Sequence, residues 1–126
     1  MIAADTSTWI AFFEDASGDD VQLLDKALGD RQVLMVPVVL AELLSDSEIP
    51  DHVAGSLKEL PMMEIEPGYW QRAGELRSKV LVKGCRARLG DALIAQSCLD
   101  HAVALLTRDR DFRAFAESAN LNLVAE

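Results

Sequence analysis

Four carboxylates stand at positions from which they could act together. Asp5 follows a short apolar run at the start of the chain, and Asp109 follows the apolar run 102–106. Glu42 and Asp91 lie in apolar helical stretches that begin near strand ends. If the apolar runs are parallel strands, all four acids reach the same edge of the sheet. That edge is where open α/β sheets bind their ligands.

Each acid taken alone also has a structural explanation. Asp5 could cap or turn the chain after a strand, Asp91 could complement a helix dipole, and Asp109 and Asp111 could cap the last helix. Glu42 is the exception, because it is the one charge in the apolar stretch 37–44 and no nearby Lys or Arg offers itself. A buried carboxylate without a partner is costly or stays protonated. We therefore expect Glu42 to be buried beside a bound cation.

A shared site for these acids predicts metal-dependent phosphoryl transfer. Converging carboxylates repel one another unless a divalent cation compensates, and hard oxygen ligands select Mg²⁺ or Mn²⁺ over zinc. One or two such ions, about 3.5 to 4 Å apart when paired, activate water for in-line attack. The remaining candidates are too isolated for zinc, redox or nucleophilic chemistry: His52, His101, Cys85 and Cys98. We expect both cysteines to be reduced, with Cys98 in the core.

The elements that position the acids alternate along the chain. Apolar runs predict strands at 1–4, 32–36, 62–66, 102–106 and 121–125. Helical spacing and end signals predict helices at 8–13, 21–29, 37–44, 50–60, 69–83, 91–99 and about 112–118. Thr6 or Ser7 would cap the first helix, Ser17 or Asp19 the second, and Gly84 would end the fifth. This order predicts an α/β fold with three layers, α/β/α, and a mostly parallel central sheet of about five strands.

Length and composition fit one domain covering residues 1–126. Half of the residues are apolar, which suffices for a core. No apolar run approaches the roughly 18 residues of a spanning helix, and the start of the chain lacks a signal-peptide pattern. We expect a cytoplasmic protein without a membrane partner.

The net charge of −9 conceals an uneven distribution. Residues 1–66 hold 3 basic and 14 acidic side chains, a balance of −11, and residues 67–126 hold 9 basic and 7 acidic, a balance of +2. The nine basic residues could form one positive surface beside an acidic pocket, or could be ordinary solvated helix faces. They are Arg72, Arg77, Lys79, Lys83, Arg86, Arg88, Arg108, Arg110 and Arg113. For the first case we select as RNA-binding candidates Arg86, Arg88, Arg108 and Arg110.

Four segments together carry a resemblance to a known family: Asp5-Thr-Ser7, Pro37-Val-Val-Leu-Ala-Glu42, Gly90-Asp-Ala-Leu-Ile-Ala95 and Leu106-Thr-Arg-Asp-Arg-Asp-Phe112. In order and spacing the chain resembles a PIN-domain ribonuclease of the VapC toxin type over essentially its whole length. The resemblance implies metal-dependent cleavage of RNA, a homodimer, and an antitoxin partner that inserts into the acidic site.

The resemblance also implies roles for single residues. Its three best-defined acids fall on Asp5, Glu42 and Asp91. The fourth falls on Asp109, with Asp111 as the alternative, because the acid of this segment varies in position within the family. The hydroxyls that would orient a ligand or its water belong to Ser7 and Thr107.

Two other functions remain open at this point. A phosphoacceptor receiver domain has a similar length and binds Mg²⁺, but it would need paired acids after the first strand and a late lysine. Here Asp5 is single and no lysine follows Lys83. A non-catalytic binding module of the same fold is the other alternative. The apolar residues Trp9, Phe12 and Phe13 could form a groove for the antitoxin or simply fill the core.

Overall fold

The sheet at the centre of the chain is parallel. The structure is a computed structural model that describes residues 1–124. Strand β1 (Ile2–Ala4) pairs in parallel with β2 (Ala104–Leu106), with Ile2 opposite Ala104. Isolated parallel bridges extend the sheet on both sides, joining Ile2 to Val33, Met35 to Met62 and Leu105 to Leu123. The α/β class with parallel pairing is confirmed.

The outer strands are shorter than predicted. Within residues 1–124 only β1 and β2 are continuous strands, and the predicted strands 32–36, 62–66 and 121–125 pair only through the isolated bridges just described. Prolines account for part of the difference. Pro37 begins a helix directly after the second segment, and Pro61 precedes the third, which limits how far a hydrogen-bonded ladder can extend. Residue 125 lies outside the described residues.

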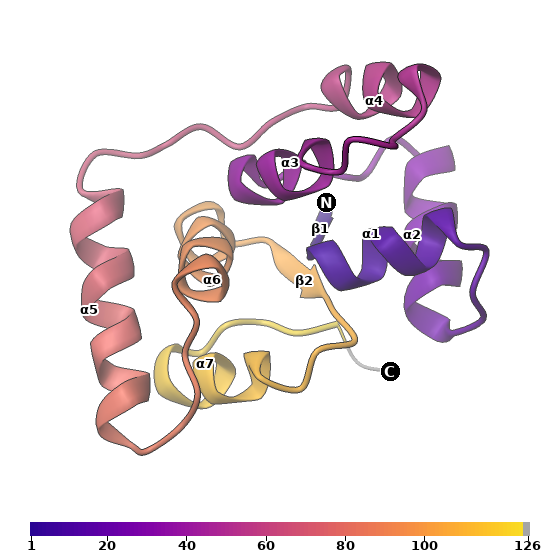
Figure 1. The fold of residues 1–126 in the computed structure, drawn as a ribbon. Coiled ribbons are helices and arrows are strands. Elements are labelled where there is room, and N and C mark those ends of the chain that lie inside the picture. The colour runs from indigo at the N-terminus through magenta and orange to yellow at the C-terminus, as the bar shows by residue number, and fades with distance from the viewer. Residues whose placement is uncertain (125–126) are drawn as a thin grey trace.

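Seven helices surround this sheet in the described chain. They are α1 (Thr6–Phe13), α2 (Asp19–Gly29), α3 (Pro37–Leu44), α4 (Asp51–Lys58), α5 (Tyr69–Val82), α6 (Leu89–His101) and α7 (Phe112–Ala119). Helix α1 packs against α2 and α3, while α5 packs against α6 and α7. Figure 1 shows the two strands between these groups, with α1 and α2 on one side and α5, α6 and α7 on the other. The three predicted layers are therefore present.

Helix starts differ from the prediction in three places. Asp5, rather than Thr6 or Ser7, caps α1, because its carboxylate accepts a hydrogen bond from the Thr8 N–H at 3.0 Å. Gly18 occupies the N-cap position of α2 in place of Ser17 or Asp19. Helix α6 begins at Leu89, so Asp91 is its third residue rather than its first. At the other end of α5 the prediction holds, since Gly84 follows the helix with φ +80°.

The core fixes the segments that carry the acids. Ala3, Leu105 and Leu106 of the two strands are buried, and Phe112 and Phe115 anchor α7 with no exposed surface. Cys98 is buried and Cys85 exposed, and both are free thiols, as predicted. None of the helices within residues 1–124 combines the length and apolar character needed to cross a bilayer.

Candidate metal centre

Asp5 lies directly after β1, and its carboxylate accepts several hydrogen bonds. Its N–H donates to the Leu106 carbonyl at 3.0 Å, which continues the pairing with β2 and places Asp5 beside Thr107. The Ser7 hydroxyl donates to both carboxylate oxygens at 2.8 and 2.9 Å, and the Thr107 hydroxyl donates to Oδ2 at 2.7 Å. The two hydroxyls selected from the sequence therefore both hold Asp5, which is only 3% exposed.

The pKa of Asp5 is raised by burial, which disfavours the charged form. Hydrogen bonds from Thr107, Ser7 and Thr8 oppose that effect, and the negative charge of Asp109 adds to it. Asp5 is thus a carboxylate whose charge the folded chain only partly compensates.

Three further acids meet beside this position. Asp91, Asp109 and Asp111 each offer a carboxylate oxygen, and these oxygens lie within 4.8 Å of one another. We call these residues the three-acid cluster. The loop after β2 holds Asp109 in place, because its N–H donates to the Thr107 hydroxyl and its Oδ1 accepts from the Asp111 N–H, both at 2.9 Å. The structure thus brings both alternatives for the fourth acid, Asp109 and Asp111, to Asp91.

The Asp91 carboxylate is incompletely compensated by the protein. Burial and, next, the charge of Asp109 raise the pKa of Asp91 to about 6, against a lowering by Arg88. Its Oδ2 is buried and has no hydrogen-bond partner within residues 1–124. Buried polar atoms are nearly always paired, because an unpaired one loses its hydration without replacement. An oxygen-lined site with an unpaired carboxylate oxygen fits Mg²⁺ or Mn²⁺.

Glu42 does not occupy the environment expected from the sequence. Its side chain is exposed and accepts a hydrogen bond from the Thr6 hydroxyl at 2.9 Å. Helix α3 instead turns Val39 and Leu43 into the core. The expectation of a buried, unpaired Glu42 is therefore wrong, and burial gives no reason for a cation there. Thr6 is adjacent to Asp5, so Glu42 lies at the side of the site rather than within the three-acid cluster.

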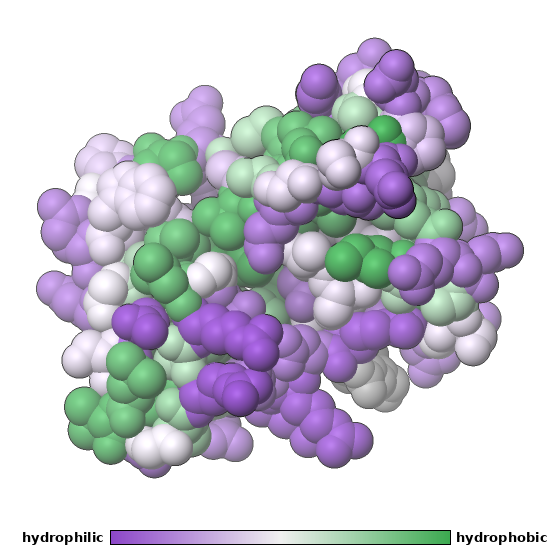
Figure 2. Space-filling view, in the orientation of Figure 1, coloured by the Kyte–Doolittle hydropathy of each residue, from purple (hydrophilic) through white to green (hydrophobic). Residues whose placement is uncertain are grey.

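Some of the nine basic residues are held by other groups of the protein, and others are exposed. Arg72 pairs at 2.6 Å with Asp100, which lies in the last turn of α6. Asp91 lies in the first turn, so this ion pair is at the opposite end of the helix from the three-acid cluster. Arg77 donates to the Ala87 carbonyl at 2.8 Å. Arg86 and Arg88 are exposed in the loop before α6, and Figure 2 shows hydrophilic residues gathered over this loop. Arg88 lies close enough to lower the pKa of Asp91, so this loop brings positive charge to the three-acid cluster.

Asp20 is a residue of this region that the sequence did not single out. It is buried, accepts a hydrogen bond from the Thr8 hydroxyl at 3.0 Å, and binds the Arg108 guanidinium through both oxygens at 2.7 and 2.8 Å. Arg108 lowers the pKa of Asp20 accordingly. Gly18 makes room for the pair, since a Cβ there would lie 2.6 Å from Asp20 and 2.7 Å from Arg108. No local pattern distinguishes Asp20 from its neighbour Asp19.

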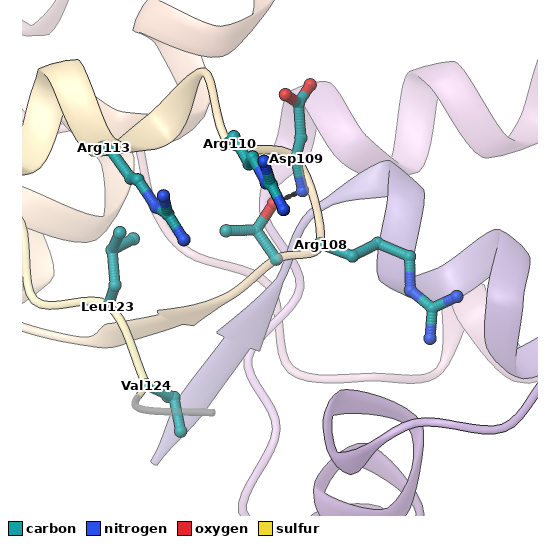
Figure 3. Close-up of a pocket in the computed structure, with 7 residues that line it drawn as sticks. Arg108, Asp109, Arg110, Arg113, Leu123 and Val124 are labelled. Atoms are coloured by element: carbon teal, nitrogen blue, oxygen red, sulfur yellow. Dashed lines mark hydrogen bonds between the residues drawn. The ribbon is translucent and has the colours of Figure 1, made fainter.

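The loop after β2 also borders a second, basic pocket. Its volume is about 420 Å³ and its lining consists of Thr107, Arg108, Asp109, Arg110, Arg113, Leu123 and Val124. Figure 3 shows Arg110 and Arg113 on the side of Leu123 and Val124, while Arg108 extends in the other direction. Asp109 therefore belongs to both the three-acid cluster and this pocket.

The apolar residues of α1 divide between core and surface. Trp9 is buried in the core, whereas Ile10 and Phe13 are 45% and 39% exposed. With Leu43 of α3 and Ile49 and Val53 near α4, these exposed residues line a groove of about 260 Å³, with Glu42 and Asp46 among its lining residues. Of the predicted residues, Trp9 therefore fills the core and Phe13 lines a groove.

Solved structures of toxin–antitoxin complexes share this fold. The chain is similar to VapBC2 from Rickettsia felis, bound to a DNA fragment from its promoter, with TM-score 0.71 and 23% identity over 98% of each chain. It is also similar to DNA-bound VapBC from Salmonella typhimurium, with TM-score 0.73 and 18% identity over 98% of each chain. A third is VapBC-5 from Mycobacterium tuberculosis, with TM-score 0.69 and 20% identity over 99% of this chain and 98% of that one.

Sequence comparison adds the family. None of the curated proteins compared with the chain matches it. The family model described as PIN domain matches residues 2–118, which contain β1, β2 and every acid of the site. The chain therefore belongs to the PIN domain family.

Proposed function

We propose that the protein is a Mg²⁺- or Mn²⁺-dependent endoribonuclease and the toxin of a toxin–antitoxin pair. The observation that carries the proposal is the buried, unpartnered Oδ2 of Asp91, which lies in a cluster with Asp109 and Asp111. Membership of the PIN domain family supports a nuclease over the receiver-domain alternative. The three VapBC structures, which are toxin–antitoxin complexes, support the biological role.

The proposed ligands are Asp5, Asp91, Asp109 and Asp111. Glu42 is proposed as a fifth ligand, because the Thr6 hydroxyl binds its carboxylate and Thr6 follows Asp5 directly. A divalent cation held by such carboxylates supplies an activated water and stabilises the leaving oxygen. Ser7 and Thr107 orient Asp5 by donating to its oxygens. No histidine or serine nucleophile is then needed.

The basic residues near the site would attract the RNA. Arg86 and Arg88 are exposed ahead of α6, and Arg110 is exposed in the loop after β2. Lysine and arginine side chains beside an acidic centre raise the local concentration of phosphate even on an acidic protein. Arg108 contributes charge from the same loop while its guanidinium binds Asp20.

Cleavage of single-stranded RNA tests the catalytic proposal. With Mg²⁺ or Mn²⁺ we expect cleaved products, excess EDTA should abolish them, and added Mn²⁺ should restore them. Calorimetric titration with Mn²⁺ distinguishes the non-catalytic alternative, since an inert module of this fold need not bind the ion. Cleavage that persists in EDTA would rule out the metal-dependent mechanism.

We propose two protein partners. The groove lined by Ile10, Phe13, Leu43, Ile49 and Val53 offers an apolar surface for an antitoxin segment. Trp70 of α5, which is 62% exposed, offers apolar surface for a homodimer. If a small protein is encoded beside this chain, its co-expression should suppress cleavage, and Phe13→Asp should relieve the suppression while leaving cleavage by the toxin alone unchanged. Suppression that withstands Phe13→Asp would place the antitoxin elsewhere.

A further inference from the structure

We propose that the basic pocket beside Asp109 is a nucleotide subsite, which binds a phosphate of the RNA strand next to the one that is cleaved. We call it the Arg110–Arg113 pocket. Its volume of about 420 Å³ falls in the range of about 300 to 1,000 Å³ that is usual for small-molecule sites. The inference rests on the proposed nuclease function for the identity of its ligand.

The first support is the pair of guanidinium groups. Arg110 and Arg113 are three residues apart in the turn that starts α7, where the Arg113 N–H donates to the Arg110 carbonyl at 3.0 Å. That spacing places both side chains on the same side of the turn, as Figure 3 shows. Two planar guanidinium groups directed at one pocket suit the oxygens of a phosphate, which arginine binds through two parallel hydrogen bonds.

The second support is what these arginines do not bind. Arg72 and Arg108 are held by Asp100 and Asp20. The side chains of Arg110 and Arg113, in contrast, make no ion pair or hydrogen bond with any other residue in the range 1–124. Both guanidinium groups are therefore uncommitted within the described chain, and their donors are available to an anion in the pocket.

The third support is the position of the pocket relative to the acids. Asp109 lines the pocket and is also a member of the three-acid cluster. Figure 3 shows its carboxylate pointing away from the guanidinium groups. The anionic site for the cation and the cationic site for phosphate thus lie on opposite sides of one residue. A strand with one phosphate at the cluster would cross Asp109 and bring a neighbouring phosphate to the arginines.

The remaining lining residues define what the subsite recognises. Leu123 and Val124 are partly buried and supply apolar surface below the arginines. Apolar side chains can support the face of a ribose or base, but they offer no hydrogen bonds to base edges. The subsite therefore contributes affinity for the RNA backbone with little preference between bases.

Salt-dependent binding of a non-cleavable RNA tests the subsite. The probe is a fluorescein-labelled 2′-O-methyl octanucleotide, bound to the full chain in EDTA, so that no catalysis is needed. We expect Arg113→Gln to weaken binding about tenfold at low salt. We also expect it to reduce the slope of log K against log salt by about 0.7, the value for one phosphate contact on a single strand. Arg110→Gln should behave alike, and oligo-U and oligo-A should give the same change.

The matched control is Arg31→Gln, which removes an exposed arginine that lines a different pocket, with Leu28 and Ser56. It should leave both affinity and slope unchanged, and thermal melts should confirm that all variants fold. If wild-type protein fails to bind the probe, or if Arg113→Gln and Arg110→Gln keep the wild-type slope, the subsite is disproved. If the slope changes as expected but the wild-type protein does not cleave RNA with Mn²⁺, the subsite stands and the proposed nuclease function fails instead.

Discussion

Replacing Asp91 by asparagine should abolish Mn²⁺ binding and RNA cleavage while preserving the fold. The Asp91 carboxylate belongs to the three-acid cluster and has a buried oxygen without a partner among residues 1–124. We therefore expect that oxygen to bind the ion directly. Residues that merely support metal ligands cost about 10- to 100-fold when replaced, so we expect at least about 100-fold loss for the ligand itself. Calorimetry with Mn²⁺ and cleavage rates measure the two effects.

The same variant should change how stability depends on pH. In the folded chain the pKa of Asp91 is about 6, above its ordinary value of 3.8. Between these values the folded state binds more protons than the unfolded state, so the free energy of unfolding rises as pH falls from about 7 toward 4. Without metal, Asp91→Asn should be more stable than wild type at pH 7 and should show a flatter pH profile.

Asp25→Asn, which replaces an exposed acid of α2, is the control for both measurements. Urea unfolding at a series of pH values gives the stability profile. Wild-type Mn²⁺ affinity in Asp91→Asn would remove Asp91 from the metal centre, whatever its effect on stability.

Two substitutions at Asp5 should separate its chemical role from its structural one. Asp5→Asn removes the charge but keeps an oxygen that can accept from the Thr8 N–H, and asparagine is as good an N-cap as aspartate. Asp5→Ala removes both, and it also removes the acceptor of the Ser7 and Thr107 hydroxyls. Cleavage should therefore fall at least about 100-fold in both variants, while Asp5→Ala should also lose at least about 1 kcal/mol in the free energy of unfolding, the value of the cap.

Urea denaturation and cleavage assays on the same preparations check this expectation. Asp19→Asn and Asp19→Ala provide the background, because Asp19 is an exposed acid in the first turn of α2 and lies outside the cluster. Equal stability of Asp5→Asn and Asp5→Ala would show that the cap contributes nothing. Undiminished cleavage by Asp5→Asn would show that its charge is not needed.

The sequence by itself determined the order of elements and the edge to which the acids belong. Apolar runs before Asp5 and Asp109 became β1 and β2, and the helices lie close to their predicted ranges. Those signals are local, because a strand or helix is encoded by the period of its own residues. In a parallel sheet the position directly after a strand already fixes the edge that a side chain reaches. Asp5 and Asp109 could therefore be placed near one another without knowledge of the packing.

Only the tertiary structure decided which side chains face the site. Helix α3 is apolar on all sides apart from Glu42, so its sequence pattern could not indicate that Val39 and Leu43, rather than Glu42, point inward. The pairing of Arg108 with Asp20 joins residues 88 positions apart and holds the Arg108 guanidinium against α2. The Arg110–Arg113 pocket likewise includes Leu123 and Val124, which come from the segment that follows α7 in the chain. Such contacts depend on how the helices and strands pack against one another. Packing between elements distant in the chain produces no periodic pattern in the sequence, so it could not be predicted from one.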